Sequence, residues 1–126
     1  MNTKPALKIL VIDDDPNVTT LLKAKLEGLG LVTHITNDAA QATSLARSLK
    51  PDLIVCDIDL GDACGGEIAQ ELGSDRRTGA IPIVFLSSMV TPEDMLKRPG
   101  GRKLISKQLK MPEIIERIMR ELPQRH

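Results

Sequence analysis

The sequence has 126 residues, a length typical of one globular domain with a single buried core. Lysine and arginine together number 17, as do aspartate and glutamate, so a net charge of zero argues against direct binding to nucleic acid or an anionic membrane. The apolar stretches run for about six residues, far short of the roughly 20 that a membrane-spanning helix requires. We therefore expect a cytoplasmic chain that forms a single domain over residues 1–126.

The first half of the chain alternates short apolar runs with amphipathic segments. A strand is expected over residues 8–12, followed by a helix from Pro16 to about Leu29. A second strand over residues 31–35 precedes a helix that Asp38 can cap. The residues expected on the buried helix faces are Val18, Leu21, Leu22, Leu26 and Leu29 in the first helix, and Ala42, Leu45, Ala46 and Leu49 in the second.

The second half repeats this alternation. The predicted strands there cover residues 52–56, 81–86 and 104–106, and a helix covers 67–72. After the strand over 81–86, a helix is expected to start at Thr91 to Asp94 and to be cut short by Pro99 to Gly101. The last helix starts at Pro112, and the residues expected on its inward face are Ile114, Ile115, Ile118, Met119 and Leu122. The continuous apolar runs at 52–56 and 81–86 are typical of parallel strands covered on both faces. The order predicts an α/β fold, a three-layer sandwich of five strand–helix units.

Four strands of this predicted sheet end at residues suited to holding a phosphoryl group. The first runs into Asp13 and Asp14, the third into Asp57, the fourth into Ser87 and the fifth into Lys107. In an open parallel sheet, function gathers beyond the carboxyl ends of the strands, so these residues can converge. An acid cluster, a second acid, a hydroxyl and a lysine outline a phosphoryl site.

Each of these residues also has a simpler structural interpretation. An aspartate run before a prolyl helix start is ordinarily a helix cap, and Asp15 can fill that role. Asp57 could be a turn residue, Ser87 could cap the next segment, and Lys107 could be one more exposed lysine. A helix cap after the first strand would not explain why the other three strands also end at suitable residues. The occurrence of such residues at all four strand ends therefore favours the phosphoryl site.

The acidic residues favour a metal ion of one kind. Two carboxylates about 4 Å apart repel by some 4 kcal/mol at an effective dielectric near 20, so Asp13, Asp14 and Asp57 could not crowd together ionised without a cation. Oxygen ligands at a solvent-open site suit Mg²⁺ better than zinc. The two cysteines, Cys56 and Cys64, lack the close spacing of a zinc or redox pair, and we expect both to be reduced.

The segments VIDDDP, PDLIVCDIDL, IPIVFLSS and LISK occur in an order and at separations that resemble the receiver domain of two-component response regulators. The resemblance covers essentially the whole chain. It implies a flavodoxin-like parallel sheet in the order 2-1-3-4-5, with the pocket where the first and third strands lie side by side.

The same resemblance implies a role for each strand-end residue. Asp57 is the implied phosphoacceptor, and Ser87 and Lys107 bind the phosphoryl group. By the same resemblance, we expect a sensor histidine kinase or a phosphotransfer protein to supply the phosphate. We expect the chain not to be an enzyme itself, and to signal to a downstream protein target or effector domain by conformational change and protein contact. The implied Mg²⁺ ligands are Asp14 directly, Asp13 through water, Asp57 through its carboxylate and Asp59 through its backbone carbonyl.

Three positions depart from the family's pattern. Gly61 stands where most members have proline, Leu104 replaces an aromatic residue that moves inward on activation, and Gln108 replaces a proline whose peptide bond is usually cis. A non-prolyl cis bond costs about 3 to 4 kcal/mol, so the loop after Lys107 is either strained or trans and repositioned. We predict a weakened or rerouted output face.

Two other functions stay open from the sequence alone. A degenerate receiver could keep the fold as a protein-docking or dimerisation module without being phosphorylated. A flavodoxin-like redox protein or a small phosphatase could share the architecture, although Phe85 is the single aromatic residue and offers no flavin platform. The chain is either a stand-alone regulator or a fragment of a longer protein.

Overall fold

A single parallel sheet runs through the middle of the computed structural model, which describes residues 6–58, 65–93 and 104–123. The strand order is β2-β1-β3-β4-β5, as predicted, and all four pairings are parallel. The strands are β1 (Lys8–Ile12), β2 (Val32–Thr36), β3 (Leu53–Asp57), β4 (Ile83–Ser87) and β5 (Leu104–Ser106).

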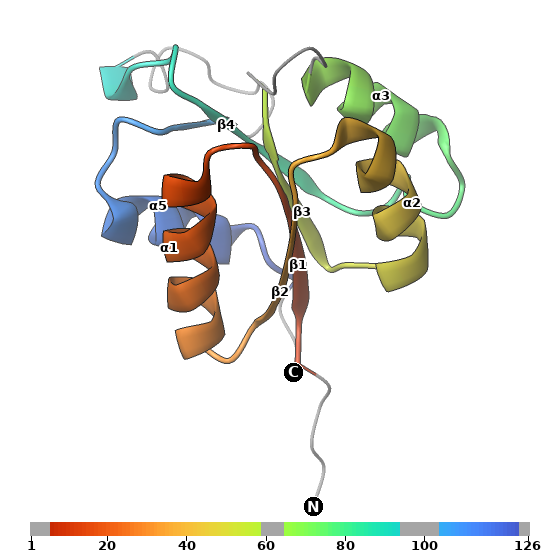
Figure 1. Cartoon of the computed structure of the whole chain (residues 1–126), viewed down its shortest axis with the longest axis horizontal. Coiled ribbons are helices and arrows are strands. Elements are labelled where there is room, and N and C mark those ends of the chain that lie inside the picture. The colour runs from red at the N-terminus through yellow and green to blue at the C-terminus, as the bar shows by residue number, and fades with distance from the viewer. Residues whose placement is uncertain (1–5, 59–64, 94–103, 124–126) are drawn as a thin grey trace, which may run out of the picture.

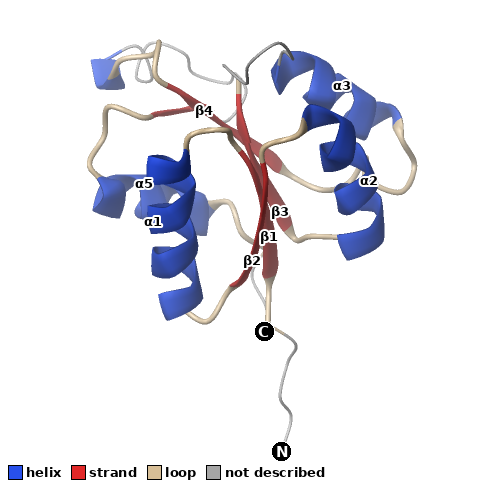
Figure 2. Ribbon diagram, viewed as in Figure 1, coloured by secondary structure: helices blue, strands red, loops and turns tan. Residues whose placement is uncertain are grey.

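Helices cover both faces of this sheet, which confirms the three-layer α/β sandwich (Figure 1). Helices α1 and α5 lie on one face, and α2 and α3 on the other (Figure 2). Their bounds are α1 (Pro16–Gly28), α2 (Ala39–Leu49), α3 (Gly65–Ser74) and α5 (Met111–Arg120). The helix predicted near Thr91 to Gly101 falls largely on residues 94–103, outside the described residues. In the described part of the chain, no helix has the length and apolar character to span a membrane.

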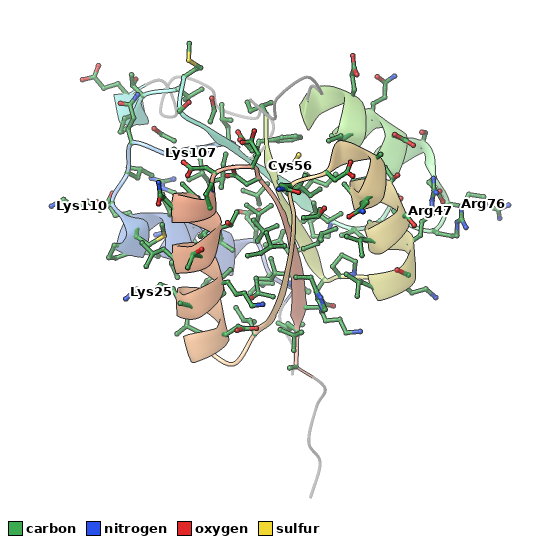
Figure 3. All side chains as sticks on the ribbon, viewed as in Figure 1. Lys25, Arg47, Cys56, Arg76, Lys107 and Lys110 are labelled. Carbon is green, nitrogen blue, oxygen red and sulfur yellow. The ribbon has the colours of Figure 1, made fainter. Side chains whose placement is uncertain are left out.

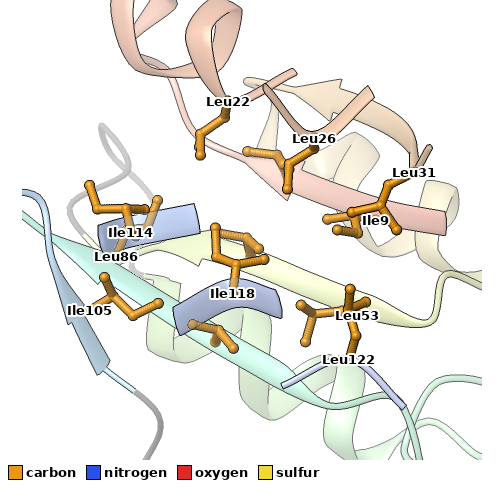
Figure 4. Close-up of a cluster of buried hydrophobic side chains, with 13 residues drawn as sticks. Ile9, Leu22, Leu26, Leu31, Leu53, Leu86, Ile105, Ile114, Ile118 and Leu122 are labelled. Carbon is orange, nitrogen blue, oxygen red and sulfur yellow. The ribbon is translucent and has the colours of Figure 1, made fainter. Parts of the chain in front are cut away.

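Two apolar clusters, one on each face of the sheet, form the core. Alternate residues of β1 supply both, because successive strand side chains point to opposite faces. Ile9 and Val11 pack with α1 and α5 in the cluster of Figure 4, whereas Leu10 and Ile12 pack with α2 and α3. Since β1 and β3 are buried on both faces, their apolar runs are continuous rather than alternating.

Aspartate caps define the starts of α1 and α2, and a turn after α1 determines where β2 begins. Asp15 and Asp38 cap α1 and α2 as predicted, each accepting a hydrogen bond from the backbone N–H two residues ahead. Helix α1 ends in a turn at Gly30, whose φ of +87° is a conformation that favours glycine. The N–H of Leu31 donates to the carbonyl of Leu26 and so belongs to this turn. The second strand therefore begins at residue 32 rather than at the predicted residue 31.

One expectation about the core was wrong. Leu21 and Leu29, which we expected on the buried face of the first helix, are 41% and 54% exposed. The buried stripe follows Val18, Leu22 and Leu26 at a spacing of four residues, and Leu21 lies one position away from it. Leu29 follows the last helical residue, so helical periodicity does not determine its direction.

The first and fifth strands have the predicted bounds, whereas those of the third and fourth shift by one or two residues. The third strand begins at residue 53 and includes Asp57. The residue before it still contacts the start of β1, because its backbone N–H donates to the carbonyl of Lys8 and its carboxylate accepts the N–H of Lys8. The fourth begins at Ile83, because Pro82 has no N–H to donate to the ladder. Both strands thus end on the candidate site residues Asp57 and Ser87 themselves.

Thr33 in β2 gives a test of the core. Its hydroxyl oxygen is buried and has no hydrogen-bond partner among the described residues. Replacing it by valine, Thr33→Val, should raise the free energy of unfolding by about 1 kcal/mol, because the shape is kept and an unsatisfied polar group is removed. As a control, Thr36→Val should lower it by about 1 kcal/mol, because the Thr36 hydroxyl accepts a hydrogen bond from the N–H of Asp38. Urea unfolding of both variants measures the two changes, and a stability loss in Thr33→Val would contradict the expectation.

Candidate functional site

The candidate site lies at the carboxyl edge of the sheet, the upper edge in Figure 1. Ile12 of β1 pairs with Cys56 of β3, so the next residues, Asp13 and Asp57, leave neighbouring strands side by side. On the other side of β3, Asp57 pairs with Leu86, which directly precedes Ser87. The strand register therefore brings together residues that are far apart in the sequence.

A cluster of charged groups forms at this edge. The Nζ atom of Lys107 lies 2.9 Å from Asp13 Oδ2 and 3.1 Å from Asp57 Oδ2, so one ammonium bridges two carboxylates. Asp13, Asp14 and Asp57 each offer a carboxylate oxygen, and these oxygens lie within 4.8 Å of one another. Asp13 and Asp57 are buried, whereas Asp14 is exposed. Figure 3 shows Lys107 near this end of the sheet.

Backbone hydrogen bonds orient the Asp13 side chain. The N–H of Asp13 donates to the carbonyl of Thr36 at 3.1 Å, which continues the pairing of β1 with β2 by one residue. The Oδ1 atom of Asp13 accepts the N–H of Asp15 at 3.0 Å. Because Oδ1 is used in this turn, Oδ2 faces the ammonium of Lys107. Asp15 thus caps the helix, and its backbone positions the neighbouring acid.

The surroundings raise the pKa of the Asp13 carboxyl and of the Lys107 amine. Burial raises the pKa of the Asp13 carboxyl, and the charge of Asp57 acts in the same direction, against partial lowering by the Asp15 N–H and by Lys107. Burial alone would lower the pKa of the Lys107 amine, but Asp13 and Asp57 outweigh this effect and raise it. Lys107 is therefore a cation at neutral pH, and the buried acids depend on it for charge compensation.

Ser87 lies at the same edge but has a different local role. It is buried, and its Oγ accepts the N–H of Met89 at 3.1 Å. The carbonyl of Ser87 accepts the N–H of Lys107 at 2.8 Å, which joins the ends of β4 and β5. The serine and the lysine are thus held together by backbone, although they are separated by 20 positions in the sequence.

The structure decides one of the alternatives that the departures from the family pattern left open. The described residues contain no cis peptide bond, so the bond between Lys107 and Gln108 is trans, and the lysine still reaches both acids. Leu104 is partly buried and packs in the cluster that contains Phe85. Asp59, the predicted carbonyl ligand, and Gly61 lie outside the described residues.

Two features of the site were not predicted. Ser106 and Gln108 make hydrogen bonds that join the end of β5 to the segment after β4. A cleft of about 420 Å³ adjoins the acids on the side of β2. Its lining residues are Asp13, Asp14, Pro16, Thr19, Ile35, Thr36, Asn37 and Gln41. Neither feature has a local sequence signal, because both join segments that only the fold brings together.

Comparison with known sequences gives a consistent result. Residues 9–119 match the family described as the response regulator receiver domain. The DNA-binding response regulator MtrA of Mycolicibacterium smegmatis is 31% identical over 117 residues, which are 91% of this chain and 50% of MtrA. The chain therefore spans about half the length of that relative. The polar-differentiation response regulator DivK of Brucella anthropi is 30% identical over 87% of this chain and 91% of its own length.

Solved structures show the same fold. The chemotaxis protein CheY4 of Vibrio cholerae has a TM-score of 0.80 at 20% identity, over 94% of this chain and all of that one. The receiver domain of the sensor histidine kinase PA1611 of Pseudomonas aeruginosa has a TM-score of 0.76 at 24% identity, over 92% of this chain and 97% of that one. The latter structure holds a magnesium ion in its active site cleft.

The bridging role of Lys107 can be tested by a double-mutant cycle. Lys107→Met should lower the free energy of unfolding at neutral pH and without divalent ions by about 2 kcal/mol, because two facing carboxylates lose their shared cation. In an Asp13→Asn background the same change should cost less, because one carboxylate charge is already gone. Urea unfolding of the four proteins gives the coupling energy. Equal losses in both backgrounds would contradict the bridge.

Proposed function

The chain belongs to the response regulator receiver family, and from that premise we propose that it accepts a phosphoryl group on Asp57 in the presence of Mg²⁺. The observation that carries the proposal is the convergence of three carboxylates and one ammonium at the carboxyl edge of the sheet. We also propose that the 126 residues form a single receiver domain.

Asp57 has the properties of the attacking group. Its carboxylate terminates a buried strand and is held beside Lys107, so its position is fixed before a donor arrives. In the proposed reaction a carboxylate oxygen of Asp57 forms a bond to phosphorus, and the bond from phosphorus to the donor breaks, with its electron pair leaving on the donor. The product is an acyl phosphate on Asp57 and a free donor.

The acidic residues fit a magnesium ion. The donor set consists of carboxylate oxygens, which Mg²⁺ prefers, and the exposure of Asp14 leaves room for the water ligands that this ion keeps. We propose that Asp14 and Asp57 bind the ion directly and that Asp13 binds it through water. When bound, Mg²⁺ would offset the negative charge that gathers during phosphoryl transfer.

Lys107 and Ser87 would respond to the new group. A phosphoryl group adds about −1.5 to −2 charges and three acceptor oxygens. The ammonium of Lys107 is already beside Asp57 and could turn to a phosphoryl oxygen without leaving the pocket. The Ser87 hydroxyl oxygen accepts the N–H of Met89, and the hydroxyl proton could be donated to a phosphoryl oxygen. The segment after Ser87 would then move and carry the signal to a protein partner.

The proposed partners follow from the family. A sensor histidine kinase, or a phosphotransfer protein loaded by one, would supply the phosphoryl group. A downstream protein, or an effector domain in the same polypeptide, would read the phosphorylated state. DNA binding is a property named for the longer MtrA and is not proposed for the residues of this chain.

Incubation with Mg²⁺ and acetyl phosphate tests the acceptor role. We expect the intact protein to gain the mass of one phosphoryl group, because Asp57 is presented at the edge of the sheet with a cation beside it. The gain should vanish in Asp57→Asn. It should persist in the matched control Asp38→Asn, because asparagine also caps a helix. A chain that gains no phosphoryl group would be better explained as a docking module.

Thermal unfolding tests the metal site separately. Mg²⁺ at about five times its dissociation constant should raise the free energy of unfolding by about 1 kcal/mol, because a ligand that binds the folded state stabilises it. Asp14→Asn should abolish this increase, since it removes a proposed direct ligand. The neighbouring Asp15→Asn should keep it, because Asp15 is a cap outside the acidic cluster. Equal stabilisation of both variants by Mg²⁺ would contradict the assignment.

A further inference from the structure

The loop that carries Lys107 is tied to the segment that follows β4 by a set of hydrogen bonds. Each of the three consecutive residues 106–108 bonds to a backbone carbonyl within residues 87–90, and we name this arrangement the loop clasp. The bonds run from Lys107 N to Ser87 O at 2.8 Å, from Gln108 Nε2 to Ser88 O at 3.3 Å, and from Ser106 Oγ to Val90 O.

The Ser106 hydroxyl lies at the centre of the clasp. It donates to the carbonyl of Val90 and accepts the N–H of Gln108 at 3.0 Å. Ser106 is fully buried, so its bond to the carbonyl of Val90 is protected from water. The carbonyl of Ser106 also accepts the N–H of Leu109 at 3.2 Å. The backbone on both sides of Lys107 is therefore fixed by specific bonds.

Gln108 supplies one donor to the loop clasp and a second donor within its own loop. Its backbone N–H reaches Ser106 Oγ, and its side-chain amide reaches Ser88 O. A proline at this position would have neither group, because proline lacks a backbone N–H and has an apolar side chain. The residue that departs from the family pattern thus provides a way to hold the loop with a trans peptide bond.

We propose that Ser106 and Gln108 are positioning residues that hold Lys107 for phosphoryl binding and couple it to the segment after Ser87. The inference rests on the proposed function, because it assigns a role in binding the phosphoryl group on Asp57. Lys107 stands between the two residues in the sequence, and its ammonium already contacts Asp13 and Asp57. A loop fixed in advance loses less conformational freedom when the lysine engages a ligand.

The clasp also gives the phosphoryl signal a defined path. If the Ser87 hydroxyl turns toward the phosphoryl group, residues 88–90 move with it, and each clasp bond transfers that movement to residues 106–108. The two elements that contact the phosphoryl group then respond as one unit.

Beryllium fluoride with Mg²⁺, a mimic of the phosphoryl group, provides the test. Gln108→Met keeps the side-chain length and removes the amide donor. We expect it to weaken binding of the mimic by roughly threefold to tenfold, the equivalent of one hydrogen bond, and to speed amide exchange at residues 88–90. Because Gln108 is exposed, the midpoint of thermal unfolding of the Gln108→Met variant should change by only about 2 °C. Ser106→Ala removes one bond of the clasp and the bond that the Ser106 hydroxyl accepts from the N–H of Gln108, and should weaken binding further.

Two controls separate positioning from a general loss of structure. Ser74→Ala removes a hydroxyl that bonds to the carbonyl of Gln70 in α3, far from the clasp in the sequence, and should leave the affinity for the mimic unchanged. In a Lys107→Met background, Gln108→Met should cause no further loss, because the lysine that it positions is absent. A full additional loss in that background would overturn the proposal.

The outcomes also distinguish this proposal from the one on which it rests. If the unmodified chain binds no beryllium fluoride and gains no phosphoryl group, the proposed function fails and the positioning role fails with it. If the unmodified chain binds the mimic and Gln108→Met binds it equally well, the clasp proposal alone is overturned. Weaker binding with a thermal midpoint that changes by no more than about 2 °C supports it.

Discussion

The contact of one ammonium with two buried carboxylates is the interaction on which the rest of the site depends. Asp13 and Asp57 leave adjacent strands, so the fold itself forces their charges together. Repulsion and burial would make this arrangement costly, and Lys107 offsets part of that cost. Lys107 supplies one charge for three carboxylates, so the pocket retains an electrostatic demand for a further cation.

The parallel sheet provides this geometry through its strand order. Because β1 lies beside β3, the acids that follow them meet, and because β4 lies beside β5, the residues after Ser87 meet those around Lys107. The first pair of strands gathers negative charge, and the second pair places a cation and a hydroxyl beside it. Hydrogen bonds between the loops then hold these groups in position, so a change at one strand end can reach another.

The strand-end residues could be predicted because their signals are local. Continuous apolar runs mark covered parallel strands, and the residue after each run must lie at the common edge, which placed Asp13, Asp57, Ser87 and Lys107. The direction of side chains near helix ends was less predictable, as Leu29 shows, because packing rather than periodicity decides it. The bonds of Ser106 and Gln108 had no sequence signal, because serine and glutamine are common in loops and their partners belong to another loop.

A crystal structure of the chain with Mg²⁺ and beryllium fluoride would show whether the charge cluster accepts both a metal ion and a phosphoryl group. We expect a beryllium atom bonded to a carboxylate oxygen of Asp57, a magnesium ion bound by Asp14, and the ammonium of Lys107 turned from Asp57 to a fluorine atom. An unmodified Asp57, still bridged to Asp13 by Lys107 at saturating concentrations of both reagents, would contradict it.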